Sequence, residues 1–151
     1  MKAKIITKNR KAFYDYEILE KYEAGIVLSG TEIKSIRQGR INIKQAYIGF
    51  FKKELFIIGM NIPEYSNSGY VSHLPDQNRK LLMHKLELKK IKQHVEEKGK
   101  TITPLSIYFK GKFVKVEFGI AVGKKKWDKR RDKIEKDVNR QLERALKKNK
   151  K

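Results

Sequence analysis

The chain is organised around residues 23–40, which read Glu23-Ala24-Gly25-Ile26-Val27-Leu28-Ser29-Gly30-Thr31-Glu32-Ile33-Lys34-Ser35-Ile36-Arg37-Gln38-Gly39-Arg40. The run from Ile26 to Leu28 consists of strand formers. Ser29 and Glu32 have the spacing of a capping box, in which each side chain bonds the backbone N–H of the other residue. Gly39 supplies the left-handed conformation that ends many helices. The stretch therefore predicts a strand, a tight turn, a short helix and a stop.

The predicted helix has one apolar face and one basic face. Ile33 and Ile36 are neighbours on the first, and Lys34 and Arg37 on the second, because residues three apart lie side by side on a helix. If the apolar face packs on a core, the two cations point outward from a rigid turn, which suits phosphate contacts. On this stretch alone, an amphipathic helix with a merely solvated basic face is an equal alternative.

The composition indicates a single, strongly basic domain. The chain has 151 residues, a net charge of +20 and a pI of about 10.0, which favour a polyanionic partner, nucleic acid first and an anionic membrane surface second. No apolar run approaches the roughly 20 residues of a membrane span, and the N-terminus lacks the apolar segment of a signal peptide. Cysteine is absent, which fits a reducing cytosol. We expect a cytoplasmic protein with no membrane partner.

The excess positive charge is concentrated at the C-terminus. Residues 124–151 hold 14 Lys and Arg against five Asp and Glu, whereas residues 1–123 hold 23 against 12. We therefore expect a folded unit at residues 1–123 and a basic tail at residues 124–151. In the tail Ile134, Val138, Leu142 and Leu146 recur every four residues, so their apolar stripe is narrow. That stripe offers too little burial to offset the ordering cost, and we expect the free tail to be disordered.

Alternating apolar residues predict six strands, at residues 13–19, 23–28, 41–51, 54–62, 105–109 and 114–122. Turns are expected at Leu19 to Tyr22, at Lys52-Lys53 and at Lys110 to Lys112, and residues 1–12 are expected to form an arm.

The stretch between the second and third pairs of strands combines a loop with helix. Residues 63–78 are rich in turn formers and predict a long loop. Residues 79–83 predict a short helix, and a pattern that ends at Lys98 predicts a second helix or a continuation of the first. Six strands that mostly neighbour in sequence, with two or three helices, favour a mainly β fold with flanking α, a closed antiparallel β-barrel.

No constellation of residues indicates catalysis. The three histidines, His73, His84 and His94, have no metal-ligand spacing, and we expect them to be solvent-exposed or to contact RNA. No glycine-rich run continues into a phosphate loop. We expect no enzyme activity, no cofactor and no metal. A nuclease or an RNA-modifying enzyme is the rival of another class, and it would turn over labelled RNA.

Aromatic side chains are interleaved with the cations and are candidates for stacking on unpaired bases. They are Tyr14, Tyr16, Tyr47, Tyr65, Tyr70, Tyr108 and Trp127. A tyrosine on a strand is more often part of the core or its rim. We expect Tyr16 and Tyr47 to face the core, and Tyr14 and Tyr70 to lie on the surface.

Several segments together resemble the SmpB family, the small proteins that bind transfer-messenger RNA (tmRNA) in bacterial ribosome rescue. The segments are Asn9-Arg10-Lys11-Ala12, Tyr16-Glu17-Ile18, Glu23-Ala24-Gly25-Ile26, Gly30 to Gly39, Arg79-Lys80-Leu81-Leu82, Gly99-Lys100-Thr101 with Pro104-Leu105, Lys115-Val116-Glu117 and Gly123 to Arg130. The match runs from about Lys8 to Arg131 and is specific in order and spacing.

The resemblance implies an oligonucleotide-binding (OB) barrel and an adaptor function. It implies binding to the tRNA-like part of tmRNA, delivery with elongation factor Tu to a stalled ribosome, and a tail that enters the empty decoding region and mRNA path of the small subunit. On that basis we expect a monomer whose tail is helical when bound to the ribosome. A ribosomal or generic single-strand-binding OB protein is the rival within the same class.

The resemblance also implies which residues contact RNA. The RNA-binding set is Asn9, Tyr16, Glu23, Gly25, Lys34, Arg37 and Leu82, to which we add the matched Arg79 and Lys80 and the surface candidate Tyr14. The decoding-region set in the tail is Lys124, Lys125, Lys126, Trp127, Asp128, Lys129 and Arg130. The chain departs from the family pattern at Gln77, at Gln45-Ala46 and at Trp127.

Glu23 requires its own explanation, since a carboxylate beside RNA is unfavourable unless it has a role. It would accept a hydrogen bond from a guanine edge or a 2′-OH, or hold Lys34 or Arg37 in place. The alternative is a surface ion pair worth about 0–1 kcal/mol. The resemblance favours a role in RNA recognition.

Overall fold

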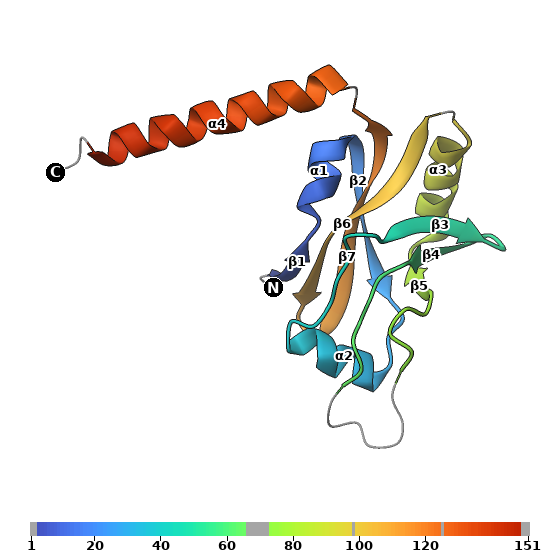
Figure 1. Cartoon of the computed structure of the whole chain (residues 1–151). Helices are drawn as coiled ribbons and strands as arrows, with labels where there is room; N and C mark the ends of the chain where they lie inside the picture. Colours follow the sequence, from blue (N-terminus) through green and yellow to red (C-terminus); the bar gives the residue numbers. More distant parts are fainter. Residues whose placement is uncertain (1–2, 66–72, 98, 125, 149–151) are drawn as a thin grey trace.

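The computed structural model describes residues 3–65, 73–97, 99–124 and 126–148. It contains one antiparallel sheet of seven strands in the order β1-β6-β7-β2-β5-β4-β3 (Figure 1). The strands are β1 (Ala3–Lys8), β2 (Tyr16–Ile26), β3 (Tyr47–Phe51), β4 (Glu54–Ile58), β5 (Arg79–Leu82), β6 (Lys100–Lys110) and β7 (Phe113–Gly123). The helices are α1 (Arg10–Asp15), α2 (Gly30–Arg37), α3 (Lys85–Glu96) and α4 (Lys126–Lys148).

The sheet is not closed, so the prediction of a closed six-stranded barrel is wrong. The edge strands are β1 and β3, and in the described part of the chain β3 approaches β6 without joining its ladder. The described residues form seven strands and four helices, one of each more than the largest number expected. The mainly β character with flanking helices is confirmed.

The predicted N-terminal arm is instead a strand followed by a helix, and the first predicted strand, residues 13–19, is divided between the end of α1 and the beginning of β2. Residues 3–8 form β1, which pairs with β6, and Asn9 caps α1 by accepting from the Ala12 N–H at 3.3 Å. The chain does not turn at Leu19 to Tyr22, because β2 pairs with β7 from Tyr16 to Gly25, with an irregularity between Ile18 and Glu20. Pairing partners about a hundred residues away thus override the local pattern.

The predicted helix at residues 79–83 is a strand. β5 lies between two partners, with Gly25 opposite Leu82 on β2 and Phe56 opposite Lys80 on β4. Two flanking strands supply the hydrogen bonds that a four-residue helix would leave unmade. The predicted strands 41–51 and 54–62 are shorter than expected, and beyond them a single bridge joins Asn42 to Asn61.

Other local signals are confirmed. α2 carries the complete Ser29–Glu32 capping box, and Gly39 follows it with a φ of +75°. α3 covers most of the second predicted helix, with Ile91 fully buried. The β6–β7 hairpin turns at Gly111, which has a φ of +64°. Lys52 and Lys53 form the turn between β3 and β4.

The core joins the inner face of the sheet to one face each of α2 and α3. Its fully buried members are Ile36, Ile43, Leu55, Ile57, Met60, Ile62, Ile91, Ile107, Val116, Phe118 and Ile120. Each such side chain contributes roughly 1.5–3 kcal/mol of burial free energy. Because Ile36 is among them, the opposite face of α2 is held toward solvent.

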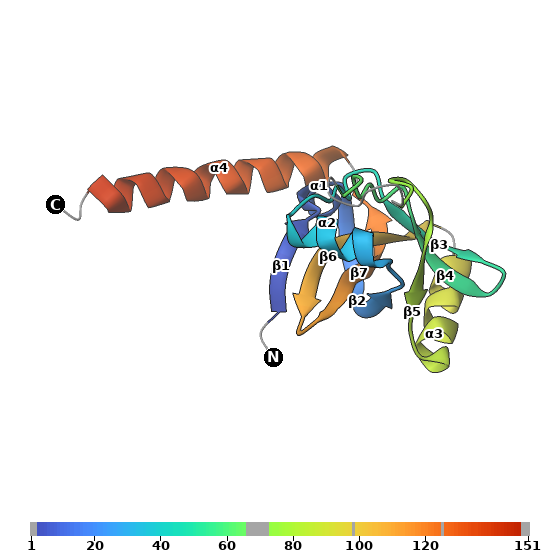
Figure 2. The same cartoon turned by 90° about the horizontal axis from the view of Figure 1, so that it is seen from below.

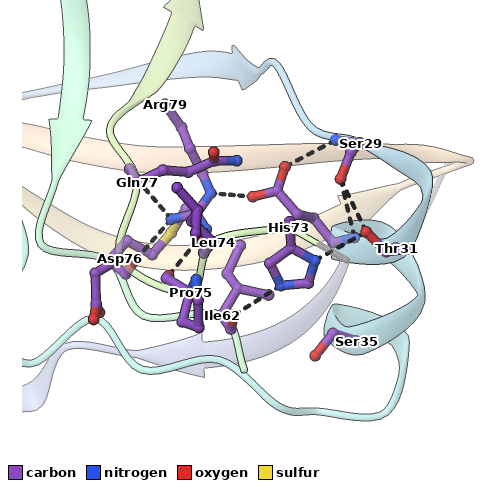
Figure 3. A network of polar contacts seen from close by, with 12 residues as sticks. Ser29, Thr31, Ser35, Ile62, His73, Leu74, Pro75, Asp76, Gln77 and Arg79 are labelled. Atoms are coloured by element: carbon purple, nitrogen blue, oxygen red, sulfur yellow. Dashed lines mark hydrogen bonds and ion pairs between the residues drawn. The ribbon is translucent and has the colours of Figure 1, made fainter. Parts of the chain in front are cut away.

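A buried polar network fastens α2 to β5 (Figure 3). The guanidinium of Arg79 forms an ion pair with Glu32 inside the protein, and both side chains are at most 2% exposed. Arg79 also donates to four carbonyls, those of Met60 (2.7 Å), Gln77 (3.0 Å), Pro75 (3.0 Å) and Leu74 (3.3 Å). All its donor groups are therefore used within the chain.

Burial opposes ionisation of Glu32, but hydrogen bonds from the Ser29 N–H and from Arg79 outweigh that effect and hold its pKa below the usual range. One carboxylate thus caps α2 and pairs with β5.

His73 is a second link between α2 and the loop. Its Nε2 donates to the Ile62 carbonyl at 2.8 Å, and its Nδ1 lies 2.9 Å from the Thr31 hydroxyl. Ser35 of the same helix donates to the Pro63 carbonyl at 2.8 Å. His73 is only 8% exposed, so the expectation of a surface histidine is wrong at this position.

The basic tail forms a long helix, α4, that extends away from the sheet in both views (Figures 1 and 2). Lys124 fixes its beginning: the backbone N–H donates to Asp15 O at 2.9 Å and Nζ donates to Phe13 O at 3.0 Å, both in α1. The apolar residues Ile134, Val138 and Leu142 are exposed. Disorder of the free tail stays a prediction. None of the described helices is long and apolar enough to cross a membrane.

The buried pair yields a stability prediction. Arg79→Ala leaves the Glu32 carboxylate buried without its counter-charge, so the free energy of unfolding should fall by about 3–5 kcal/mol in urea titrations. Lys80 lies on the same strand as Arg79 and forms a half-exposed ion pair with Glu54 of β4. Lys80→Ala should lower the free energy of unfolding by only about 0–1 kcal/mol. Equal effects of the two substitutions would show that the buried pair does not organise the fold.

Candidate nucleic-acid interface

Two residues predicted to bind RNA, Gly25 and Leu82, lie together with Lys115 on the outer face of the sheet. Gly25 of β2 lies opposite Leu82 on β5 and opposite Lys115 on β7. A Cβ at Gly25 would lie 3.6 Å from Leu82 Cβ and 3.9 Å from Lys115 Nζ, which is ordinary van der Waals contact, so both side chains lie close to the glycine. Leu82 is 54% exposed, which is unusual for a leucine on a central strand.

Two hollows meet at Gly25, Leu82 and Lys115. One, of about 570 Å³, continues along β2 past Glu23 to the beginning of α3. The other, of about 310 Å³, leads past Phe113 to Ile33 on α2. We call the two together the sheet trough. It runs from α3 to α2 with an apolar floor and lysines along its sides.

Glu23 is a fixed, charged acceptor beside this trough. It accepts hydrogen bonds from Tyr108 Oη and from Lys110 Nζ, the latter at 3.4 Å. The Tyr108 hydrogen bond, assisted by Lys110 and Lys115, outweighs partial burial and holds the pKa of Glu23 below its usual range. Burial and the Glu23 charge in turn raise the pKa of Tyr108. The Glu23 side chain remains 40% exposed, so its carboxylate has room for a further donor.

The partners of Glu23 differ from those the sequence suggested. Tyr108 and Lys110 hold it, whereas Lys34 and Arg37 lie on α2, and in the described part of the chain Glu23 is bonded to neither of them. A surface ion pair, the alternative considered for Glu23, also does not describe its contacts fully, because Tyr108 supplies the strongest one. Only the β2–β7–β6 register brings Tyr108 to Glu23, and that register contains a bulge in each pair.

Like charges gather on the trough wall and are offset by lysines. Glu23 lies directly opposite Glu117 across β2 and β7, which is unfavourable in isolation. Lys21 Nζ lies 4.0 Å from Glu117, and Lys115 lies two pairs further along the ladder, on the same face of the sheet. The wall is therefore a mixed patch in which carboxylates are fixed acceptors and lysines supply positive charge.

The basic face of α2 is exposed as predicted. Lys34 and Arg37 both point to solvent, and Lys34 Nζ lies 5.6 Å from the ring centroid of Tyr65. Arg40 donates to the Glu64 carbonyl at 3.3 Å. These cations are oriented by the helix whose opposite face is in the core.

Two of the predicted contact residues are buried. Asn9 is 5% exposed, caps α1 and donates through Nδ2 to the Pro104 carbonyl at 3.0 Å. Arg79 is 2% exposed and fully bonded. Their burial suits a role in supporting the surface, and direct RNA contact by Asn9 or Arg79 stays a prediction.

The remaining predicted residues lie at other places on the surface. Tyr14 is exposed on α1, and Tyr16 is half-buried at the beginning of β2. Lys80 lies on the same face of β5 as Leu82, bonded to Glu54 at 3.0 Å. Tyr47 was expected in the core but is 55% exposed, and Tyr70 lies outside the described residues.

The decoding-region residues lie at the other end of the molecule from α2. Lys124 is bonded to α1, Lys125 lies outside the described residues, and residues 126–130 begin α4. Figure 1 shows α4 leaving the sheet at the α1 end, with α2 at the opposite end. The described residues contain no group of His, Asp and Glu that would hold a metal ion.

The fold and its surface define a small, basic, mainly β binding protein with a trough across its sheet. The SmpB protein family matches residues 6–148. The SsrA-binding protein of Carboxydothermus hydrogenoformans is 48% identical over 95% of this chain and 96% of its own length, and that of Geobacillus thermodenitrificans is 48% identical over 95% and 92%. The chain belongs to the SmpB family.

A solved structure extends the similarity to the fold. It is described as "tmRNA-SmpB: a journey to the center of the bacterial ribosome", and it matches with a TM-score of 0.67 and 45% identity over 80% of this chain and 85% of that chain.

The Glu23–Tyr108 contact yields a titration prediction. Tyr108→Phe removes the largest effect that lowers the pKa of Glu23, so that pKa should rise toward the ordinary range of a glutamate in a side-chain carboxyl NMR titration. Tyr22→Phe is the matched control, because Tyr22 makes the equivalent bond to Glu20 at 2.6 Å. The control should raise the pKa of Glu20 and leave Glu23 unchanged. An unaltered Glu23 pKa in Tyr108→Phe would refute the assignment.

Proposed function

We propose that this protein binds the tRNA-like part of tmRNA and delivers it to stalled ribosomes for trans-translation. The observation that carries this is the convergence of Glu23, Gly25 and Leu82, three residues of the implied RNA-binding set, in one open trough. The names of its relatives, SsrA-binding proteins, support the same RNA, since SsrA RNA is tmRNA. The protein acts as a cytoplasmic adaptor without catalysis.

The trough suits a folded RNA surface more than a single strand. Leu82 and Gly25 offer a flat apolar floor to a ribose or an unstacked base. Glu23 accepts from a guanine edge or a 2′-OH, which gives discrimination that lysines alone do not provide. Lys110 and Lys115 on one side, and Lys34 and Arg37 on α2, contact phosphates.

The tail carries the ribosomal half of the proposed function. Residues 124–151 enter the empty decoding region of the small subunit and the mRNA path, with Asp128, Lys129 and Arg130 in the decoding region. Repulsion among the lysines weakens beside ribosomal RNA, so the tail is stabilised as a helix there. In the free protein the tail is disordered. The partners are then tmRNA, the ribosome and, indirectly, elongation factor Tu with aminoacylated tmRNA. The net charge of +20 opposes self-association, in accord with a monomer.

Two variants separate the halves of this proposal. Lys34→Ala/Arg37→Ala should weaken binding of the tRNA-like RNA and flatten the slope of log K against log salt concentration by about 0.7–0.9 for each lost phosphate contact. Asp128→Ala/Lys129→Ala/Arg130→Ala should bind the same RNA nearly as well as the wild type, yet fail to support tagging of chains on stalled ribosomes.

Bulk tRNA is the competitor in both binding assays. Equal affinity for bulk tRNA and the tRNA-like RNA would indicate a generic RNA-binding protein. Normal tagging by the tail variant would contradict the role of the tail.

A further inference from the structure

A second groove lies between α3 and the strands β3, β4 and β5. Figures 1 and 2 both show α3 beside β4 and β5. The groove has a volume of about 670 Å³ and an apolar floor. The floor is formed by Phe50, Leu55, Leu81, Met83 and Leu88. Phe50, Met83 and Leu88 are only half-buried, so the groove leaves apolar surface open to solvent.

Lysines surround this floor on both sides. They are Lys52, Lys53, Lys80, Lys85, Lys89 and Lys92. Lys85, Lys89 and Lys92 follow one face of α3 at the spacing i, i+4, i+7, and all three are exposed. Glu54 is the single carboxylate of the lining, and its contact is Lys80, at 3.0 Å. Five of the six rim cations are exposed.

The lysines of the β3–β4 turn occupy an unfavourable backbone. Lys52 and Lys53 have φ values of +49° and +68°, in the left-handed region. Two-residue hairpin turns with positive φ at both positions strongly favour Asn-Gly, because most side chains are strained there. The chain nevertheless has lysines at both positions. Turn stability alone would favour other residues, and the two lysines add positive charge to the rim of the groove.

We propose that this groove, which we call the α3 groove, binds a short acidic amphipathic helix of a partner protein. The apolar face of such a helix, with anchors at i, i+3, i+4 and i+7, fits an aliphatic floor. Its flanking carboxylates face the lysines on both sides of the groove. An apolar centre surrounded by a rim of complementary charges is typical of protein–protein interfaces.

Other occupants fit the α3 groove less well. The floor has one aromatic ring, Phe50, whereas single-stranded nucleic acid binds on several stacking rings. A second copy of this chain, or its own basic tail, would bring like charges together. The α3 groove meets the sheet trough at Leu82 and Met83, but its lysines lie outside that trough.

The test uses the full chain and a designed probe. The probe is a fluorescein-labelled peptide of about 14 residues, roughly four helical turns, with Leu on one face and Glu beside it. A scrambled peptide of equal composition keeps the charge and loses the apolar face. The variant is Lys52→Asn/Lys53→Gly, which restores the favoured turn residues and removes two rim charges. The matched control is Lys4→Asn/Lys8→Asn, on the opposite edge strand.

The peptide should bind the wild type more tightly than its scrambled form, measured by fluorescence anisotropy in about 0.1 M salt. Lys52→Asn/Lys53→Gly should weaken peptide binding roughly fivefold, with affinity for the tRNA-like RNA unchanged, and the control variant should bind the peptide as the wild type does. Equal binding of both peptides, or equal behaviour of variant and control, would overturn the proposal. A loss of RNA affinity by Lys52→Asn/Lys53→Gly would also overturn the proposal and identify the groove as an RNA surface. Failure of the wild-type protein to bind the tRNA-like RNA would contradict the proposed function and would leave the peptide result unaffected.

Discussion

The buried ion pair between Glu32 and Arg79 is the interaction on which the arrangement of the binding surface depends. A buried pair is favourable only when every remaining donor and acceptor is satisfied. That condition is met here, because Glu32 also caps α2 and Arg79 donates to four carbonyls of the loop before β5. Lysine at position 79 would keep the charge but lack the donors that reach these carbonyls. One pair thus sets α2, the loop and β5 relative to one another.

The elements held by this buried pair, β5 and α2, also carry the exposed binding surface on their opposite faces. Side chains alternate along a strand, so Arg79 and Leu81 point inward while Lys80 and Leu82 point outward. On α2, Glu32 and Ile36 are buried and Lys34 and Arg37 are exposed. The α2 end of the sheet trough and its centre at Leu82 are therefore positioned by the same buried network. A loss of the network would move Leu82 and the two α2 cations together.

Local chemistry predicted the elements whose signals lie within a few residues. The capping box, Gly39 and the alternation in β7 correctly predicted α2 and the last hairpin. β5 and β1 were missed because their hydrogen-bond partners are distant in sequence, and four residues such as Arg79–Leu82 have no decisive period. The resemblance to the family predicted Glu23, Gly25 and Leu82 as RNA-binding residues. Their grouping on one face, and the hydrogen bond from Tyr108 to Glu23, depend on a strand register with bulges. No local sequence pattern indicates that register.

Lysine acetylation footprinting on the complex with tRNA-like RNA tests the central claim most directly, because it asks which face the RNA covers. The account predicts that RNA protects Lys34 on α2, Lys115 in the sheet trough and Lys110 beside Glu23 from acetylation by a soluble reagent. It also predicts that Lys52, Lys53, Lys89 and Lys92 of the α3 groove stay as reactive as in the free protein. Protection of the α3-groove lysines, with Lys34, Lys110 and Lys115 still reactive, would contradict the account.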